Sequence, residues 1–211
     1  MRLRKKSWSN EMFELHQDIL IEENNTLKNK WKETLNVDTL RLEIGAGRGD
    51  YWHGLSAQFP EQGIVAMERD FTAASIALKK LDDKNNKRFI YGDAKDIENY
   101  FGEKELDAIH MNFSDPWPKA RHAKRRLTHA SKCELYHRLL NDNGHLIFKT
   151  DNLSLFEYSL VSVAKNGFEL EEVWLDFRST EDADPYTEYE RKFMGKGQPI
   201  YRAVWRKINV K

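Results

Sequence analysis

Short apolar runs alternate with helix-like segments along most of this chain, and that alternation restricts the folds open to it. Helices are expected near residues 50–59, 71–81, 131–140 and 153–164. Strands are expected at residues 40–44, 63–67, 88–91, 106–113, 145–149, 168–177 and 200–207. Strand–helix alternation of this kind is typical of a doubly wound α/β sheet. We therefore predict a mostly parallel, seven-stranded sheet with helices on both faces, in which the last two strands are antiparallel.

A chain of 211 residues is expected to form one domain with ample core. Residues 1–36 are predicted to be a basic N-terminal arm and helix packed on the main domain, and residues 37–211 the sheet domain. Met12–Leu35 carries apolar residues at partly helical spacing and is expected to pack outside the sheet. No linker or internal repeat separates these parts.

The charge of the chain is balanced in total but unevenly distributed. It contains 34 Lys and Arg and 34 Asp and Glu, yet residues 1–10 and 119–133 carry ten of the basic residues and no acid. The remaining chain is therefore acidic. A concentration of positive charge on an otherwise acidic protein favours a directed encounter with a polyanion such as nucleic acid. The alternative is that both segments are simply solvated loops.

Other site chemistries are disfavoured by composition. The single cysteine excludes an intramolecular disulfide, and neither it nor the seven scattered histidines has zinc-site spacing, so no metal is expected. No apolar run reaches membrane-spanning length, and no apolar signal segment follows the basic N-terminus. We expect a cytoplasmic protein.

A glycine-rich turn and three acids predict a cofactor site. Gly45 and Gly47 lie in a turn between the first strand and its helix, where free backbone N–H groups face a ligand. Glu43 lies inside the first strand, Glu68 ends the second, and Asp93 follows the third. Because ligands of such sheets bind beyond the carboxyl ends of strands, these acids are expected at one site.

The type of cofactor follows from these acids. A carboxylate at Glu43 needs a partner inside a strand, and the sulfonium and amino groups of S-adenosyl-L-methionine would supply one. Glu68 is placed to accept from ribose hydroxyls and Asp93 to meet an adenine edge. A pyrophosphate would be repelled, and the glycine spacing departs from the dinucleotide fingerprint because Asp50 stands where its last glycine belongs. Structural alternatives remain: Glu68 and Asp93 could be caps, and Glu43 could pair with Arg41 or Arg48.

An acid and a dense basic segment follow the strand at 106–113. Asp115 stands in the run N-F-S-D-P-W-P-K, whose prolines would stiffen the loop. Trp117 could stack on a base or act as a hydrophobic wedge. The basic residues that follow within a few positions are Lys119, Arg121, Lys124, Arg125 and Arg126, together with His122. An acid beside a cationic loop indicates an enzyme that modifies nucleic acid.

The chain resembles the bacterial tRNA (guanine-N7-)-methyltransferases from about Leu40 to Trp205. The matching motifs are E-I-G-A-G-R-G, M-E-R, G-D-A, N-F-S-D-P-W-P-K, R-H-A-K-R-R-L, F-K-T-D-N and T-E-Y-E. The segments D-P-W-P-K and T-E-Y-E are the specific parts, whereas the glycine motif is generic. The resemblance implies a Rossmann-like class I methyltransferase fold. The chain departs from the family at Ala120 and Ala123, where charged residues are frequent, which puts the affinity for RNA in doubt.

The resemblance also implies roles for individual residues. Cofactor contacts are implied for Glu43, Gly45, Gly47, Glu68, Asp93 and Asp115. Contacts to the target guanosine are implied for Lys119, Asp151, Thr187, Glu188, Tyr189 and Glu190. RNA contacts are implied for Arg121, His122, Lys124, Arg125 and Arg126. The implied substrate is tRNA and the implied target is guanine 46 of its variable loop.

The chemistry of such a reaction sets what the residues must do. Guanine N7 carries a lone pair and no proton, so its methylation requires no general base, and catalysis rests on positioning and on carboxylates that stabilise the emerging purinium. Asp115 is expected to take that central part. Asp151 and Glu190 could accept from the guanine N1–H and N2 amine. Their alternatives are a helix cap for Asp151 and an ion pair with Arg191 for Glu190. A solvated lysine, a helix cap and core packing are the alternatives for Lys119, Thr187 and Tyr189.

Other functions remain open from sequence. A methyltransferase for protein or small molecules would not need the charge density of 119–126. One for exocyclic amines usually has two adjacent prolines where Trp117 separates Pro116 from Pro118. A non-enzymatic RNA-binding module would not need the three acids. A dinucleotide oxidoreductase is disfavoured by the glycine spacing. No obligatory protein partner or membrane is expected, and the oligomeric state is a monomer or homodimer.

Overall fold

The computed structural model describes residues 6–22, 27–82, 85–180 and 183–209. The basic residues Arg2, Arg4 and Lys5 of the predicted arm lie outside the described residues. The chain divides into two compact units: the first contains residues up to Gly102 with Pro185–Glu188, and the second contains Glu103–Asp184 and Tyr189–Lys211. The predicted division at residue 36 stays a prediction.

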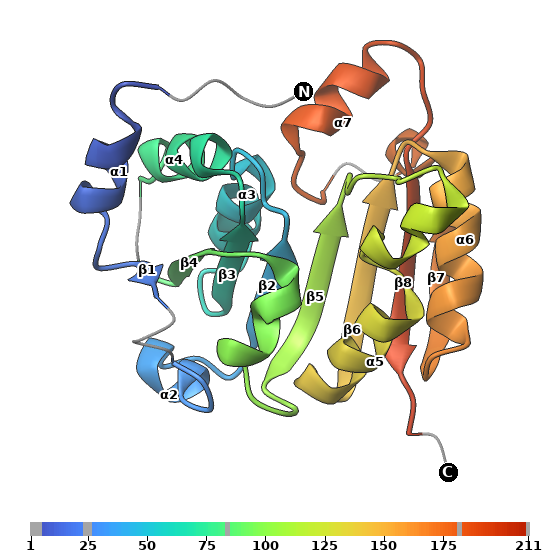
Figure 1. Cartoon of the computed structure of the whole chain (residues 1–211), viewed down its shortest axis with the longest axis horizontal. Helices are drawn as coiled ribbons and strands as arrows, with labels where there is room; N and C mark the ends of the chain where they lie inside the picture. Colours follow the sequence, from blue (N-terminus) through green and yellow to red (C-terminus); the bar gives the residue numbers. More distant parts are fainter. Residues whose placement is uncertain (1–5, 23–26, 83–84, 181–182, 210–211) are drawn as a thin grey trace. The chain divides into compact units, whose positions relative to one another are not determined.

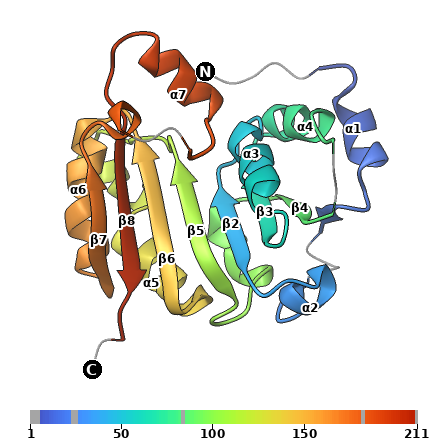
Figure 2. The ribbon, with the colours of Figure 1, turned by 180° about the vertical axis from the view of Figure 1, so that it is seen from behind.

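The first unit is an all-parallel sheet in the order β1-β4-β3-β2 (Figure 1). Its strands are β1 (Leu20–Ile21), β2 (Leu40–Ile44), β3 (Gly63–Glu68) and β4 (Lys87–Tyr91). Its helices are α1 (Ser9–Leu15), α2 (Trp31–Leu35), α3 (Asp50–Gln58), α4 (Phe71–Lys79) and the 3-10 helix η2 (Ala94–Asn99). Figures 1 and 2 show α3 and η2 on opposite faces of this sheet.

Local sequence explains these elements. Every residue of β3 is buried, as expected for a central parallel strand. Asp70 caps α4, because its carboxylate accepts from the backbone N–H groups of Thr72 and Ala73 at 3.0 and 2.9 Å. Gly49 begins α3 with φ of +80°, a conformation that favours glycine.

The N-terminal segment partly joins the sheet. Helix α1 packs on α4, where Ser75 Oγ donates to Ser9 Oγ at 2.9 Å and the Lys79 ammonium lies 4.3 Å from the Trp8 ring centroid. Leu20 and Ile21, however, pair in parallel with Phe89 and Ile90. The expectation that Met12–Leu35 packs outside the sheet is therefore wrong at β1. Its two residues were too short a run to show a strand period.

The second unit is a mixed sheet in the order β5-β6-β8-β7. Its strands are β5 (Leu106–Asn112), β6 (Leu140–Thr150), β7 (Phe168–Trp174) and β8 (Tyr201–Lys207). Strands β5 and β6 are parallel, and β8 is antiparallel to both β6 and β7, as predicted. Helices α5 (Ala130–Leu139) and α6 (Leu153–Ala164) lie on the same face of this sheet. That face is toward the viewer in Figure 1 and away from the viewer in Figure 2. Shorter helices are η3 (Ala120–Arg125), η4 (Phe177–Ser179) and α7 (Glu188–Met194).

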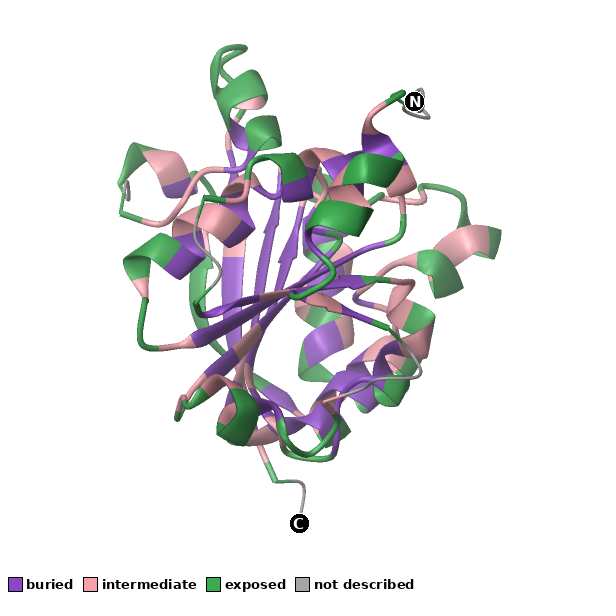
Figure 3. Ribbon diagram, turned by 90° about the vertical axis from the view of Figure 1, so that its left-hand side faces the viewer, coloured by how far each residue is buried: buried purple, intermediate pink, exposed green. Residues whose placement is uncertain are grey.

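The fold class is as predicted: an α/β architecture with mostly parallel strands and helices on both faces. The described residues form eight strands rather than seven, and β1 is the additional one. In each unit the strands carry most of the buried residues and the helices carry exposed ones outward (Figure 3). Helix α7 was not predicted, because it is short and its one buried residue is the charged Glu190 rather than an apolar side chain.

The glycine turn yields a stability prediction. Gly45 and Gly49 both have φ near +80°, but a Cβ on Gly45 would meet nothing within 4 Å, whereas one on Gly49 would lie 2.8 Å from the Cβ of Ala77. Gly45→Ala should lower the free energy of unfolding by about 1–2 kcal/mol, the cost of a left-handed L-residue. Gly49→Ala should cost more, because α4 must also shift. Urea denaturation without cofactor measures both, and equal losses would contradict the close approach.

Candidate functional site

The predicted cofactor acids of the first unit lie toward the carboxyl ends of neighbouring parallel strands. Glu43 is opposite Ala66 in the β2–β3 pair, and Glu68 is opposite Tyr91 in the β3–β4 pair. Asp93 follows β4 directly and begins η2. Glu43 is buried, with 2% of its surface exposed. Parallel register therefore places three carboxylates along one edge of this sheet.

Glu68 fastens the glycine turn to the end of β3. One carboxylate oxygen accepts from the Gly47 N–H at 2.9 Å, and the other accepts from the N–H groups of Arg69 and Asp70 at 2.9 and 2.7 Å. The N–H groups of Gly45 and Ala46 donate to the Met67 carbonyl oxygen at 2.8 and 3.1 Å, so the expectation that free N–H groups of the turn face a ligand is wrong at these positions and at Gly47. A carboxylate offers about four acceptor sites, so a ligand hydroxyl can still be accommodated. Glu68 does not cap α4, since Asp70 does.

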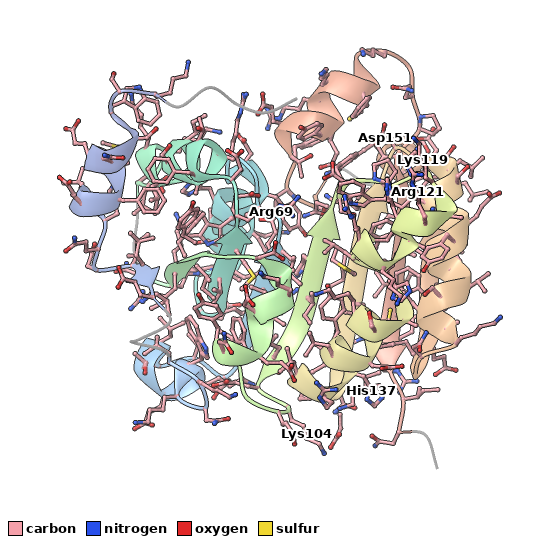
Figure 4. All side chains as sticks on the ribbon, in the orientation of Figure 1. Arg69, Lys104, Lys119, Arg121, His137 and Asp151 are labelled. Carbon is pink, nitrogen blue, oxygen red and sulfur yellow. The ribbon has the colours of Figure 1, made fainter. Side chains whose placement is uncertain are left out.

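Asp93 makes the contact expected of a capping residue, which was the alternative to a role in cofactor binding. Its carboxylate accepts from the Lys95 N–H at 3.0 Å and pairs with Arg69 at 3.4 Å. Figure 4 labels Arg69 just beyond the end of β3. Arg41 was considered as an ion-pair partner of Glu43. In the structure the Arg41 guanidinium donates to the side-chain oxygen of Gln62 at 2.6 Å. The cofactor roles of Glu43, Gly45, Gly47, Glu68 and Asp93 stay predictions.

Part of the T-E-Y-E segment belongs to the first unit. The side chain of Glu188 pairs with Arg48 of the glycine turn at 2.6 Å, and both groups are substantially exposed. Pro185 packs on α3 so closely that a Cβ on Gly54 would lie 2.6 Å from it. Thr187 is buried, with 9% of its surface exposed. This segment is thus attached to the turn and helix that carry the predicted cofactor site.

The loop after β5 contains strained backbone. Phe113 and Trp117 have φ of +52° and +41°, which side chains with a Cβ rarely adopt. Such strain concentrates at functional sites. Asp115 lies between them and is exposed. The sequence suggested a stiff loop from its prolines, and the structure adds two residues held in an unfavourable conformation.

Arg126 holds this loop in place. Its guanidinium donates to the carbonyl oxygens of Pro116 and Trp117, both at 3.1 Å, and lies 4.3 Å from the ring centroid of Tyr158 on α6. Arg125 lies over the Trp117 ring at 4.7 Å. Arg126 was predicted to contact RNA, but its donors are directed at the backbone beside Asp115. This is a contact by which an arginine can orient a loop.

The rest of the basic segment faces outward. Lys119, Arg121, Lys124 and Arg125 are exposed, and His122 is half-buried with its ring edge-on to Trp117 at 5.7 Å. In Figure 4, Lys119, Arg121 and Asp151 lie at one end of the second unit and Lys104 and His137 at the other. The positive charge of η3 therefore gathers at the end where β5 and β6 finish.

Asp151 follows β6, which is paired in parallel with β5. The alternative that Asp151 caps α6 is wrong, because Asn152 is the cap: its side chain accepts from the Leu155 N–H at 2.8 Å. The half-buried Asp151 and the exposed Asp115 thus follow the ends of adjacent strands. Their roles stay predictions.

Glu190 is buried among charged groups rather than paired at the surface. Its carboxylate contacts Lys149 of β6 and Arg178 of η4. Tyr189, the preceding residue, is 54% exposed and stacks with Phe113 and Phe193, with both centroid distances 6.3 Å. Lys149 and Arg178 were not singled out from sequence. The only signal was a lysine inside an apolar strand, and nothing in the sequence showed that it would be buried.

Comparison with known proteins identifies the family. A family model described as "Putative methyltransferase" matches residues 38–203. The tRNA (guanine-N(7)-)-methyltransferase of Limosilactobacillus reuteri (strain DSM 20016) is 40% identical over 209 residues, covering 97% of this chain and 98% of that protein. The protein of the same name from Lactococcus lactis subsp. cremoris (strain MG1363) is 41% identical over 208 residues and covers 96% of each chain.

The chain belongs to the tRNA (guanine-N7-)-methyltransferase family. A solved structure of an antibiotic-related methyltransferase has the same fold, with a TM-score of 0.67 over 88% of this chain and 94% of that one, at 14% identity. Within the described residues of this family member, no group of three or more His, Cys, Asp or Glu could hold a metal ion. No described helix is long and apolar enough to cross a membrane.

The two kinds of arginine in the basic segment of this methyltransferase should behave differently. Arg121→Ala should weaken tRNA binding and reduce the slope of log affinity against log salt by about 1, because an exposed phosphate contact is lost. Arg126→Ala should leave that slope unchanged and lower the turnover rate, because the loop carrying Asp115 loses its backbone contacts. Binding titrations at several salt concentrations and single-turnover kinetics check both.

Arg126→Lys and Lys132→Ala are the matched controls. A lysine retains the charge of Arg126 but cannot donate in the same fork geometry, so the turnover defect should persist. Lys132, a half-buried basic residue of α5, should behave as wild type. If Arg126→Ala changed the salt slope as much as Arg121→Ala, Arg126 would be a phosphate contact and not a loop clamp.

Proposed function

We propose that this chain transfers the methyl group of S-adenosyl-L-methionine to N7 of a guanine in tRNA, at position 46 of the variable loop, and so forms 7-methylguanosine. The observation that carries the proposal is the 40% identity to proteins named for this activity over nearly the full length of both chains. The acids at the strand ends and the exposed basic segment fit the two substrates.

The first unit supplies the cofactor residues. We propose that Glu43, Gly45, Gly47, Glu68 and Asp93 hold S-adenosyl-L-methionine, which supplies an electrophilic methyl on a cationic sulfur. The buried carboxylate of Glu43 suits a positively charged ligand and disfavours a pyrophosphate. The carboxylate of Glu68 orders the turn through Gly47. This arrangement presents acceptors to an amine, a ribose and an adenine.

The second unit supplies most of the residues for the nucleic acid. We propose that Asp115 stabilises the positive charge that develops on the purine, by hydrogen bonding or field and without abstracting a proton. The residues proposed to contact the target guanosine are Lys119, Asp151, Thr187, Glu188 and Tyr189, whereas Glu190, for which the resemblance implied the same contact, is buried against Lys149 and Arg178. The residues proposed to contact RNA are Arg121, His122, Lys124 and Arg125, whereas Arg126, for which the resemblance implied the same contact, is proposed to hold the loop through the carbonyl oxygens of Pro116 and Trp117.

Charge distribution supports tRNA as the polyanionic partner. The exposed cations of η3 can replace the counterions of several phosphates, which is the main source of affinity for nucleic acid. No step of the reaction requires a second kind of protein chain. We propose that the active form is the monomer or homodimer and that it acts in the cytoplasm.

Methyl transfer to unmodified tRNA transcripts tests the proposal. One transcript carries G at position 46 and a matched transcript carries A. Incorporation of labelled methyl only into the G transcript, recovered as 7-methylguanosine after digestion, is the expected result. Incorporation into both transcripts, or as another methylated nucleoside, would contradict the proposed target.

Asp115→Ala should lower the rate of methyl transfer by roughly 100- to 1,000-fold, the loss typical when one stabilising group at a developing charge is removed. Binding of tRNA should change little. Asp142→Ala is the matched control, because Asp142 is an exposed acid of the same unit, paired with Lys104. Calorimetric binding and single-turnover rates check both variants, and near-wild-type turnover in Asp115→Ala would show that the assigned role is wrong.

A further inference from the structure

Four charged side chains form a buried cluster in the second unit, here called the Lys149 cluster: Lys149, Arg178, Asp184 and Glu190. The side chains of Lys149 and Glu190 are fully buried, that of Arg178 is 2% exposed and that of Asp184 is 16% exposed. Two cations and two anions at this depth make a neutral group.

The contacts within the cluster are short and directional. Lys149 Nζ donates to Asp184 Oδ2 at 2.6 Å and lies 3.1 Å from both oxygens of Glu190. Arg178 Nε donates to Glu190 Oε1 at 3.0 Å, and its Nη2 lies 2.8 Å from the same oxygen. Arg178 also donates to the backbone oxygen of Asp184 at 2.8 Å. Each carboxylate therefore has two cations beside it.

Stability alone is a weak reason for such a cluster. Removing four charges from water is costly, and well-packed apolar side chains of similar volume often stabilise a protein as much or more. What the cluster supplies is geometry, because Arg178 presents its donors in a fixed fork and Lys149 lies on a central strand.

The cluster joins helix α7 to the sheet. Lys149 belongs to β6, Arg178 to η4 and Glu190 to α7, and Glu190 is the one buried residue among the described residues of α7. The other packing contact of α7 among the described residues is aromatic: Tyr189 and Phe193 both stack on Phe113, with centroid distances of 6.3 Å. A helix of seven residues is not stable by itself in water, so its position depends on these tertiary contacts, of which the buried ionic one of Glu190 is the more directional.

The anchored helix presents Tyr189 to solvent. Tyr189 precedes the buried Glu190, is 54% exposed, and stacks with Phe113 and Phe193. The backbone N–H of Phe113 donates to the carbonyl oxygen of Lys149 at 2.8 Å, so the same strand residue also supports the stack. Aromatic faces of this kind bind nucleobases by stacking, which is sequence-tolerant and worth about 1–3 kcal/mol per base.

We propose that Lys149 and Arg178 are positioning residues that hold Glu190 as an anchor for α7, so that Tyr189, rather than Glu190, meets the target guanine. This inference rests on the proposed function. It replaces the expectation that Glu190 accepts from the guanine N1–H and N2 amine, because in the structure its carboxylate lies fully buried against two cations. In the T-E-Y-E segment, Tyr189 then provides the aromatic face for stacking and Glu190 the buried contact that attaches α7 to the sheet.

The first test compares Lys149→Met and Arg178→Met with Lys104→Met. Lys104 forms an exposed ion pair with Asp142 in the same unit and serves as the matched control. Both cluster variants should lower the turnover number on tRNA by about 100-fold, as expected when a substrate-contacting element is misplaced. Affinity for S-adenosyl-L-methionine should be unchanged, and Arg178→Lys should recover part of the activity. Wild-type turnover in both cluster variants would overturn the proposal.

Folding is monitored separately. Burial raises the pKa of the Cys133 thiol to about 12, so this single cysteine of the second unit should resist thiol reagents while the unit is folded. Its labelling rate should stay slow in the variants. Hydrogen exchange of residues 188–194 should accelerate. If Lys149→Met labels rapidly at Cys133, Lys149→Met/Asp184→Asn, which restores charge balance, takes its place in every measurement.

Anchoring and base reading are separated by a second substrate. Inosine at position 46 retains N7 and lacks the N2 amine. Glu190→Gln, Lys149→Met and Arg178→Met should all lower the rates on guanosine and inosine transcripts by the same factor, since none of them reads the base. A loss of the preference for guanosine in Glu190→Gln alone would show that Glu190 reads the base and would overturn the proposal.

Failure of the proposed function has a different signature. A wild-type protein that methylates neither transcript would refute the proposed reaction, while faster hydrogen exchange of α7 in Lys149→Met would still support the anchor. Slow exchange of α7 in all cluster variants of an active enzyme would refute the anchor and leave the reaction intact.

Discussion

Parallel pairing of strands is the constraint on which the site depends. It brings the carboxyl ends of β2, β3 and β4 to one edge of the first unit, and those of β5 and β6 to one edge of the second. Acids that are far apart in the sequence become neighbours for this reason alone. Each is then fixed by local contacts, such as the three backbone N–H groups that Glu68 accepts from.

Two kinds of charge serve different purposes in this family member. Exposed cations such as Arg121 and Lys124 remain available to solvent and suit a mobile polyanion. Buried or half-buried cations such as Arg126, Arg178 and Lys149 are directed at carbonyl and carboxylate oxygens of the chain itself. A count of basic residues in the sequence includes both kinds, but the charges of Lys149 and Arg178 are balanced by carboxylates beside them.

The sequence was sufficient for the fold and for the strand ends that the acids follow, because apolar periodicity, glycine turns and strand-end acids act locally. It was insufficient for β1, whose two residues carry no period, and for α7, which is attached through a buried ionic contact and an aromatic stack. The strain at Phe113 and Trp117 is set by tertiary contacts, among them those of Arg126, and the sequence offered only two prolines as a signal. The burial of Lys149 and Glu190 depends on contacts between residues 35 and 41 positions apart, which no local pattern reports.

The position of the methyl group in a mixed pool of unmodified tRNAs tests the central claim most directly. Reduction followed by aniline treatment cleaves RNA chains at 7-methylguanosine, and the fragments map the modified nucleotide. Cleavage confined to guanine 46 of the variable loop, dependent on S-adenosyl-L-methionine and on the intact enzyme, is the result that this account predicts. Uncleaved chains, or cleavage at guanines elsewhere, would contradict it.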